Sequence, residues 1–452
     1  MNDTLHRLLE NKPCLIADGG MGTSLFAAGL ETGGSPELWN VEHPDRVQAI
    51  HAGFIEAGAD IILTNTFGGT RYRLKLHQMD DRVDELNQAA TRVAHAAADA
   101  AGRPVVVAGD MGPTGELFEP LGILTRALGI DAFTEQARAL AAGGADILWI
   151  ETMSSREEVE AAALGAAATG LPVVCTLTFD TAGRTMMGMT PEDAAVFCQG
   201  LDVSPVAFGA NCGNGPAELV NAMTRLAAAA RADAVLIAKS NCGIPEFIDG
   251  QVRYDGTPEI MAVYARMARD AGARIIGGCC GSTPEHLRAM VSALAGYTPQ
   301  AMPDIAAIEA RLGPLAAAAK PGGVAAADLD GRREAPRVGL HLAAGSRPRI
   351  ADGPFPGVYI DALEQPRHGV GVGRREGLGG RPVVGLEYDQ AAGHGLAVLA
   401  EIRPGEFHRG GMGLKVFEVR LAVLHAQGQA VGFVDTGNGE IHAAFSKQGV
   451  IY

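Results

Sequence analysis

The chain has 452 residues, of which 47% are hydrophobic, and it carries a formal net charge of −15 with a pI of about 5.3. This length fits one large domain plus a smaller region better than three equal domains, and the acidic balance argues against a nucleic-acid-binding surface, which needs a basic face. The N-terminus lacks an uncharged apolar core, and no apolar run approaches the roughly 20 residues of a membrane helix, so a cytoplasmic protein is expected.

Eight short, nearly continuous apolar runs recur through the first two thirds of the chain. They occupy residues 14–20, 59–67, 104–112, 145–153, 172–179, 205–213, 234–241 and 273–281. Strands of a parallel sheet that is covered on both faces have this composition. Ala-rich segments long enough for helices lie between the runs. Thr-Pro pairs at 190–191, 257–258 and 283–284 have the pattern of a helix N-cap followed by a first-turn proline.

Eight strand-then-helix units in under 300 residues predict an α/β fold, a (β/α)8 TIM barrel over residues 1–300. A doubly wound open sheet is the alternative. No Gly-x-Gly-x-x-Gly motif follows the first run, which disfavours the dinucleotide-binding version of that fold. Barrel enzymes carry their catalytic groups at the carboxyl ends of the strands, and polar residues end the runs found here.

The region after residue 300 has a different composition. Residues 301–337 are rich in Ala, Gly and Pro and are expected to form a linker. Residues 338–452 form a glycine-rich C-terminal extension without cysteine. Its strand-like runs are 357–363, 381–389, 396–402, 417–426 and 429–437. No motif indicates a role, and the extension is interpreted as a β-rich appendage, as a disordered tail, or as a segment that is not an evolved domain.

Three of the seven cysteines follow strand ends that lie close together in a closed barrel. Cys212 lies at the end of the sixth run, and Cys279 and Cys280 lie at the end of the eighth. Three thiolates around one point suit Zn²⁺, and three protein ligands leave the fourth position for substrate or water, as in a catalytic site. Adjacent strand residues point to opposite faces, so the backbone must bend at the Cys-Cys pair, which the flanking glycines permit.

The other four cysteines are interpreted mainly as small buried hydrophobes. Cys14, Cys175 and Cys198 lie at a strand start, within a strand and on a helix. Cys242 lies at a strand end, and for it a role as a fourth ligand stays open.

Two acids, Asp18 and Glu151, also end apolar runs, so each is expected to face a cavity. Together they would hold a cationic group such as a substrate amine. The alternatives are a loop cap for Asp18 and an ion-pair partner for Glu151. Other candidate substrate contacts are the backbone N–H groups of Gly19 and Gly20 and the side chains of Asn65, Thr66 and Asn211. An acidic pocket, a glycine turn and a thiol-binding metal describe an amino acid that carries a thiol.

Six segments carry a family resemblance. They are ADGGMGT (17–23), GADIILTNTF (58–67), GPTG (112–115), IETM (150–153), GANCGNGP (209–216) and GGCCGSTPEHL (277–287). In this order they resemble the homocysteine S-methyltransferase family, which includes betaine-homocysteine methyltransferases and the homocysteine domain of cobalamin-dependent methionine synthase. The resemblance covers roughly residues 12–295 and does not extend to the last 150 or so residues.

The resemblance implies a barrel that binds zinc through Cys212, Cys279 and Cys280, with the sulfur of homocysteine at the open position. It also implies that Asp18 and Glu151 contact the amino group of homocysteine. The expected function is then zinc-dependent methyl transfer to the homocysteine thiol, which yields methionine. Metal binding removes the thiol proton and so makes a nucleophile available at neutral pH.

The methyl donor is expected to be betaine or a related methyl-onium compound. The stretch PELWNVEHPDRV (36–47) resembles the betaine enzymes, whereas Gly68 and Thr152 replace aromatic residues of the animal enzyme. Trp39, Phe67, Tyr72 and Phe179 are candidates for an aromatic cage around a quaternary ammonium. S-methylmethionine, dimethylsulfonium compounds and a corrinoid partner protein are the alternatives.

A non-enzymatic alternative is a zinc- or redox-sensing barrel whose thiols respond to oxidation. Small-molecule substrates are the expected partners, with neither nucleic acid nor membrane. A homo-oligomer is left open, because the C-terminal extension does not resemble the one through which the animal betaine enzyme forms oligomers.

Overall fold

The computed structural model describes residues 4–243, 245–248 and 251–315, and five strands between residues 370 and 434. The chain divides into two compact units, Met1–Ala326 and Ala327–Tyr452. The strand-like run 357–363 and the predicted linker beyond residue 315 lie outside the described residues. None of the helices that the structure describes is long and apolar enough to cross a membrane.

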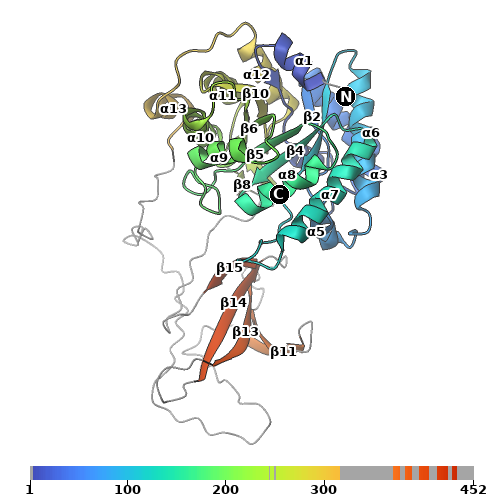
Figure 1. Ribbon diagram of the computed structural model, residues 1–452, viewed down its shortest axis with the longest axis vertical. Helices are drawn as coiled ribbons and strands as arrows, with labels where there is room; N and C mark the ends of the chain where they lie inside the picture. Colours follow the sequence, from blue (N-terminus) through green and yellow to red (C-terminus); the bar gives the residue numbers. More distant parts are fainter. Residues whose placement is uncertain are drawn as a thin grey trace, which may run out of the picture. The chain divides into compact units, whose positions relative to one another are not determined.

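The first unit is built on an eight-stranded parallel sheet that closes into a barrel (Figure 1). Its strands are β1 (Leu15–Ile16), β2 (Ile61–Leu63), β3 (Val106–Met111), β4 (Ile147–Met153), β5 (Val173–Leu177), β6 (Ala207–Cys212), β7 (Leu236–Ser240) and β10 (Ala273–Gly278). The pairing order runs β1-β10-β7-β6-β5-β4-β3-β2. A parallel bridge between Ala17 and Ile61 then joins the β1 segment to β2. All eight predicted strands and the predicted (β/α)8 barrel are confirmed.

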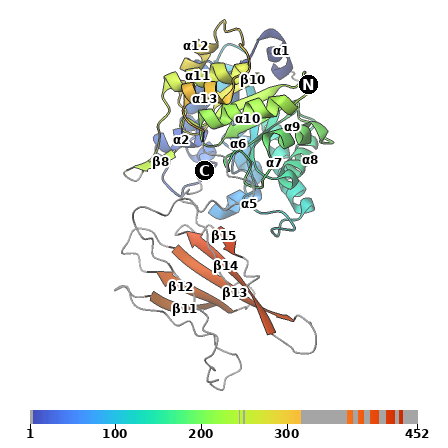
Figure 2. The same ribbon diagram turned by 90° about the vertical axis from the view of Figure 1, so that its left-hand side faces the viewer.

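Helices surround the strands in both views of Figures 1 and 2. They are α1 (Thr4–Asn11), α2 (Met21–Ala27), α3 (Trp39–Glu42), α4 (Pro44–Glu56), α5 (Arg71–Leu74), the 3-10 helix η1 (Lys75–His77), α6 (Val83–Ala100), α7 (Arg126–Gly143), α8 (Arg156–Ala167), α9 (Pro191–Gly200), α10 (Pro216–Ala229), α11 (Pro258–Asp270), α12 (Pro284–Leu294) and α13 (Ile305–Leu312). The three Thr-Pro pairs start α9, α11 and α12, as the sequence predicts. Each threonine is the N-cap, and the proline occupies the first turn, where its missing N–H costs no hydrogen bond.

Side chains alternate along each strand between the two faces of the barrel wall. One face packs against the helices in a large cluster that includes Ile62, Val107 and Leu148. The other face fills the inside of the barrel. We call this inner cluster the apolar interior; its buried members are Leu5, Leu15, Ala17, Ile61, Leu63, Val106, Ala108, Ile147, Trp149, Val174, Ala207, Ile237 and Ile275.

Farther along the same strands, in phase with the apolar interior, the inward residues become polar. We call this set the polar layer; it consists of Asp110, Glu151, Asn211, Lys239 and Cys279. Asp110, Glu151 and Lys239 each come two residues after a member of the apolar interior, and Asn211 and Cys279 come four residues after one. The polar layer therefore lies at the carboxyl end of the barrel, where barrel enzymes place their catalytic groups.

Two further elements were not predicted. A hairpin of β8 (Pro245–Ile248) and β9 (Gln251–Tyr254) follows β7. Helix α13 lies inside the predicted linker, contacts α10 and α11, and fully buries Ile308.

The second unit contains a five-stranded antiparallel sheet in the order β11-β12-β13-β14-β15. Its strands are β11 (Val370–Glu376), β12 (Pro382–Tyr388), β13 (Leu396–Glu406), β14 (Lys415–His425) and β15 (Ala430–Val434). Four of them coincide with strand-like runs in the sequence, whereas the glycine- and arginine-rich β11 was missed.

Candidate active site

Three thiols converge at the carboxyl end of the barrel. The Sγ atoms of Cys212, Cys279 and Cys280 all lie within 4.8 Å of one another. Cys212 ends β6, and the other two follow β10, which is separated from β6 only by β7. The structure thus brings together the three cysteines that the sequence grouped.

The backbone bends where these thiols meet. Cys212 has φ +63° and is followed by Gly213 at φ +77°, while Gly281, directly after the Cys-Cys pair, has φ +78°. A non-glycine residue rarely adopts this left-handed conformation, which is found mostly where surrounding contacts enforce it. Here the bends allow Cys279 and Cys280 to present their sulfurs to one point, although they are adjacent in the chain.

Two asparagine side chains hold the cysteine-bearing loops. The Asn241 Nδ2 donates to the carbonyl of Gly213 (2.7 Å), and its Oδ1 accepts from the N–H of Cys280 (3.0 Å), so one amide bridges the loops after β6 and β10. The Asn211 Nδ2 donates to the Thr152 Oγ1 (2.7 Å) and lies 3.9 Å from the Cys279 Sγ, and its Oδ1 accepts from the Thr152 N–H (2.9 Å). Thr152 has φ +62°, and this clamp stabilises that conformation.

The glycine turn after β1 packs directly against the cysteine loop. A Cβ on Gly20 would lie 2.7 Å from the carbonyl oxygen of Cys279, and one on Gly19 would lie 2.5 Å from the Phe54 ring and 3.0 Å from the carbonyl oxygen of Ser282. The N–H of Gly20 donates to the carbonyl of Ser282 (3.2 Å). The two glycines therefore permit close approach of the two loops, and the Gly20 N–H already has a partner inside the protein.

A buried ion pair lies beside the thiols. The Lys239 Nζ is 3.0 Å from the Asp18 Oδ1, and the side chains are only 3% and 2% exposed. The Asp18 Oδ2 accepts from the N–H of Leu63 (2.7 Å). Burial by itself would lower the pKa of Lys239, but Asp18 and Glu151 raise it above its usual value, so the lysine remains charged. The Lys239 ammonium also lies 5.3 Å from the centre of the ring of Trp149, a member of the apolar interior.

Two further carboxyl groups belong to the polar layer. Asp110 is 4% exposed and Glu151 is 8% exposed. The Asp110 Oδ1 and the Glu151 Oε2 have no hydrogen-bond partner within the part of the chain that the structure describes. Burial raises the pKa of both groups, and the charge of Glu151 raises that of Asp110 further. Glu151 also lies where the β4–β5 register shifts, between Ile150 and Met153.

Asn65 and Thr66 use their side chains to hold neighbouring backbone. The Asn65 Nδ2 donates to the carbonyl of Pro36 (2.7 Å), and the Thr66 hydroxyl donates to the carbonyl of Asp110 (2.7 Å). Cys242 also lies apart from the three-thiol cluster, because its thiol donates to the carbonyl of Gly256 (2.9 Å) and burial raises its pKa to about 12.

The sequence analysis missed Lys239, Asp110 and Asn241. Lys239 and Asp110 lie inside runs that were read as apolar strands, at positions in phase with inward residues. A charged residue within an otherwise buried strand was the available signal, because such a residue needs a partner or a function. Asn241 follows β7 directly, so its position at a strand end was the corresponding signal.

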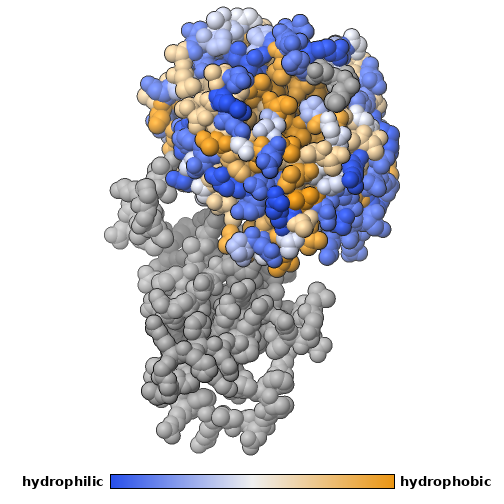
Figure 3. All heavy atoms as spheres, in the orientation of Figure 1, coloured by the Kyte–Doolittle hydropathy of each residue, from blue (hydrophilic) through white to orange (hydrophobic). Residues whose placement is uncertain are grey.

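Exposed apolar side chains lie on two of the loops at the barrel mouth. Loops that follow β3 and β5 expose Leu117, Leu121, Ile123, Met186 and Met187. The face drawn in Figure 3 likewise gathers apolar residues near its middle, with polar residues around them.

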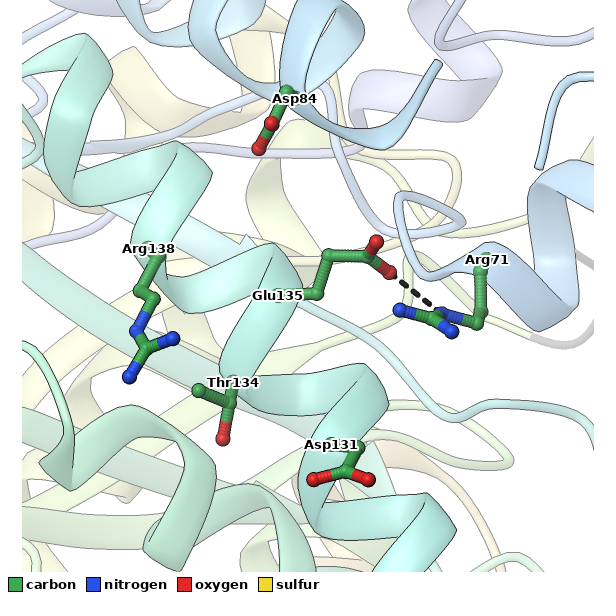
Figure 4. Close-up of a pocket in the computed structure, with 6 residues that line it drawn as sticks. All are labelled: Arg71, Asp84, Asp131, Thr134, Glu135 and Arg138. Carbon is green, nitrogen blue, oxygen red and sulfur yellow. Dashed lines mark hydrogen bonds and ion pairs between the residues drawn. The ribbon is translucent and has the colours of Figure 1, made fainter. Parts of the chain in front are cut away.

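A separate pocket lies on the helical exterior, between α5, α6 and α7 (Figure 4). It has a volume of about 340 Å³ and is lined by Arg71, Asp84, Asp131, Thr134, Glu135 and Arg138. Arg71 and Glu135 form an ion pair across it (2.7 Å). Its lining is mostly charged and includes none of the residues that end the barrel strands, so it is not the candidate active site.

The donor set of the thiol cluster fits zinc. Tetrahedral sulfur ligation with Zn–S bonds of about 2.3 Å places ligand sulfurs about 3.8 Å apart, a spacing that three thiols within 4.8 Å reach by small side-chain rotations. Three cysteines leave one position of a tetrahedron for another ligand.

Comparison with known proteins assigns the barrel to a family. The family model described as homocysteine S-methyltransferase matches residues 15–294. The methionine synthases of Mycobacterium tuberculosis and Mycobacterium leprae are 34% and 33% identical to the chain over 299 residues, which is 62% of this chain and 24% of each relative. The chain thus spans about a quarter of the length of these relatives.

Solved structures of the homocysteine methyltransferase MmuM from Escherichia coli have the same fold. The oxidized form is 25% identical with a TM-score of 0.55, and the match covers 64% of this chain and 99% of that one. The metallated form is 24% identical with the same TM-score and the same coverage.

Proposed function

Because the chain belongs to the homocysteine S-methyltransferase family, we propose that it is a zinc-dependent enzyme that transfers a methyl group to the thiol of homocysteine and yields methionine. The observation that carries the proposal is the meeting of three thiols with a buried acidic group at the mouth of this family's barrel. Cys212, Cys279 and Cys280 would hold the zinc ion. Glu151 and Asp18 supply negative charge for the ammonium group of the substrate.

Zinc, when bound, lowers the pKa of a thiol that reaches it, so that a thiolate is available at neutral pH. The residues of the chain supply the rest. The buried acids orient the amino end of homocysteine, and the Asn211–Thr152 and Asn241 contacts keep the three cysteines in place. The apolar loops at the mouth exclude water. In the reaction, the sulfur of homocysteine forms a bond to the methyl carbon while the bond from that carbon to the donor breaks, and the thiol proton leaves to solvent.

We infer that the methyl donor is an onium compound, with betaine or a sulfonium such as S-methylmethionine as the candidates. The acids of the barrel mouth outnumber its lysine, which favours a cationic donor. Trp39 does not support an aromatic cage, since it packs with Leu25, Leu30 and Val47. Phe179 is 5% exposed within the core. Phe67 and Tyr72 are the partly exposed aromatic candidates.

A corrinoid-dependent reaction is the second candidate. It is favoured by the 34% and 33% identity to two methionine synthases, of which the chain covers 24%. In this case the barrel would receive its methyl group from a corrinoid bound elsewhere.

A donor panel with homocysteine and zinc-loaded protein tests these proposals. Betaine, S-methylmethionine, dimethylsulfoniopropionate and methylcobalamin would each be assayed for methionine formation, with zinc measured by mass spectrometry. Activity with an onium donor supports the first candidate, and activity with methylcobalamin alone supports the second. Zinc binding without methionine formation from any donor would contradict both and favour a sensing role.

Cys280→Ser should remove zinc and activity together. Cys14→Ser is the matched control, because Cys14 precedes β1 and so lies at the opposite end of the barrel. Full zinc content in Cys280→Ser would contradict the three-cysteine site.

A further inference from the structure

Each of the three clustered thiols lies beside an uncharged side chain that can donate a hydrogen bond to its sulfur. The pairs are Cys279 with Asn211, Cys212 with Asn241, and Cys280 with Tyr254. Asn211 belongs to β6, Asn241 directly follows β7, and Tyr254 ends β9. Three separate segments of the barrel mouth therefore supply one donor each.

The Asn211 amide is oriented by two bonds to Thr152. Its Oδ1 accepts from the Thr152 N–H (2.9 Å), which fixes the opposite end of the amide as the donor. One hydrogen of Nδ2 goes to the Thr152 Oγ1 (2.7 Å). An amide nitrogen carries two hydrogens, and the second is left for the Sγ of Cys279 at 3.9 Å.

The Asn241 amide repeats this arrangement on the next loop. Its Oδ1 accepts from the Cys280 N–H (3.0 Å), and one hydrogen of Nδ2 goes to the carbonyl of Gly213 (2.7 Å). The side chain also forms a hydrogen bond with the thiol of Cys212. Both amides thus use one hydrogen to hold a loop and the other to contact sulfur.

The third donor is a buried phenol. The Tyr254 hydroxyl has no partner at ordinary hydrogen-bond distance among the described residues. It interacts with all three thiols, and a longer hydrogen bond to Cys280 is the direct contact among these. The ring lies so close to Gly281 that an added Cβ there would clash with it. A buried hydroxyl without a full bond is costly, so its position indicates a bond that tightens when the sulfur is ionised.

Protection of the cysteines matters because four sulfurs would compete for one methyl group in the proposed reaction. Every thiolate is a nucleophile, whether it belongs to a cysteine ligand or to the substrate. If a cysteine sulfur formed the bond to the methyl carbon while the bond to the donor broke, a neutral thioether would replace the charged ligand, and the zinc site would be lost. A hydrogen bond to a thiolate engages the lone pair that would attack, and such charge-assisted bonds are strong.

We propose that Asn211, Asn241 and Tyr254 protect the three cysteine ligands from methylation, one donor for each sulfur, and so direct the methyl group to the substrate thiolate. The proposal rests on the proposed function, because it takes the zinc site and the methyl donor from it. The three donors are occupied by cysteine sulfurs. The substrate sulfur receives no hydrogen bond from them and is the most nucleophilic of the four.

Methylation of the zinc-loaded protein by methyl iodide, resolved for each cysteine, tests the protection. Methyl iodide is small enough to reach every sulfur, and tandem mass spectrometry separates the adjacent Cys279 and Cys280. Tyr254→Phe removes the hydroxyl and keeps the ring. Methylation of Cys280 should then be about 10-fold faster, with a change of less than about 2-fold at Cys212 and Cys279. Zinc release, measured in parallel, should follow the methylation of Cys280.

Tyr297→Phe is the matched control. The Tyr297 hydroxyl donates to the carboxylate of Asp270 (3.0 Å), so this variant also loses a phenol that has a partner, but outside the thiol cluster. It should leave the methylation of all three cysteines unchanged. Asn211→Ala is an independent variant, and in it the faster methylation should move to Cys279.

Equal acceleration at all three cysteines in Tyr254→Phe would show that the hydroxyl only restricts access of the reagent. No acceleration at Cys280 would show that the hydroxyl does not protect this sulfur. Either result overturns the proposal and leaves the proposed function standing. A zinc-loaded wild-type protein that makes no methionine from homocysteine with any donor would overturn the proposed function, while the methylation pattern would still report on the protection.

Discussion

The apolar interior and the polar layer occupy the same face of the same strands, yet their side chains have opposite chemistry. The apolar interior fills the barrel with residues such as Ile237 and Ile275. Two to four residues later, the same strands bring Lys239 and Cys279 to the mouth. Burial is nearly as complete in both regions. In the apolar interior, burial stabilises the fold. In the polar layer, burial removes water from charged groups and thiols, so these groups remain available to bind a ligand.

The two regions should differ most in their effect on zinc binding and methyl transfer, and two substitutions in and just after β10 compare them. Cys279→Ser should abolish zinc binding and lower methionine formation by more than about 100-fold, because loss of a partner that merely orients a metal ligand already costs about 10- to 100-fold. Zinc content and methyl transfer are the measurements. Ile275→Val, four residues earlier on the same face, is the control and should retain its zinc. Loss of zinc in the control as well would show that the two regions are not separable.

The buried lysine should matter more for stability than any single aliphatic side chain. Lys239→Met leaves Asp18, Asp110 and Glu151 without their cation, and we expect the free energy of unfolding to fall by about 3–5 kcal/mol. Denaturant unfolding measures this change. The double variant Lys239→Met/Asp18→Asn should recover part of the loss, because it removes one of the stranded charges. A neutral effect of the single variant would mean that the acids are protonated in the folded protein.

A titratable residue in an apolar environment provides a comparison outside both regions. His51 on α4 is fully buried, neither ring nitrogen has a partner among the described residues, and burial lowers its pKa to about 4. In the unfolded chain His51 takes up a proton as the pH falls through about 6.5, whereas the folded protein resists protonation until about pH 4. Its contribution to stability is therefore complete above pH 6.5 and is lost as the pH falls toward 4.

The expected loss from His51 is about 3 kcal/mol between these two pH values. Denaturant unfolding at pH 7, 5.5 and 4.5 measures it, with His51→Leu as the comparison. The wild type should lose stability relative to the variant as the pH falls. A difference that is independent of pH would show that the ring is already solvated in the folded protein.

The smallest effect is expected in the apolar interior. Ile237→Val removes one methylene group two residues before Lys239 and should cost about 0.5–1.5 kcal/mol. Zinc content should be unchanged. A loss of zinc here would indicate that packing in the apolar interior sets the position of the polar layer.

The strands and the thiol cluster could be predicted because each depends on local sequence. A continuous apolar run marks a strand that is buried on both faces, and a cysteine after such a run lies at the mouth whatever the details of packing. Lys239 and Asp110 could not be placed in the same way. In a run that is apolar on both faces, the sequence does not reveal which alternate residues point into the barrel. The face on which a charged side chain lies therefore cannot be predicted.

The hydrogen-bond partners of the candidate site residues could not be predicted from the sequence either. Asn65 and Asp18 follow their strands as predicted, yet Asn65 is tied to Pro36 and Asp18 to Lys239, residues 29 and 221 positions away in the chain. Such partners depend on the complete packing of the barrel. Strand β11 was missed for a related reason, because its glycines and arginines (VGVGRRE) give no apolar run.

The pairing of β1 with β10 has a consequence for synthesis of the protein. The sheet closes into a barrel only when its last strand has been made, and that strand is followed at once by two of the three thiols. A ribosome-bound chain that ends between residues 212 and 278 carries Cys212 but neither Cys279 nor Cys280. Such a fragment has an open sheet and an incomplete thiol set, so metal retention reports that translation has passed the whole barrel.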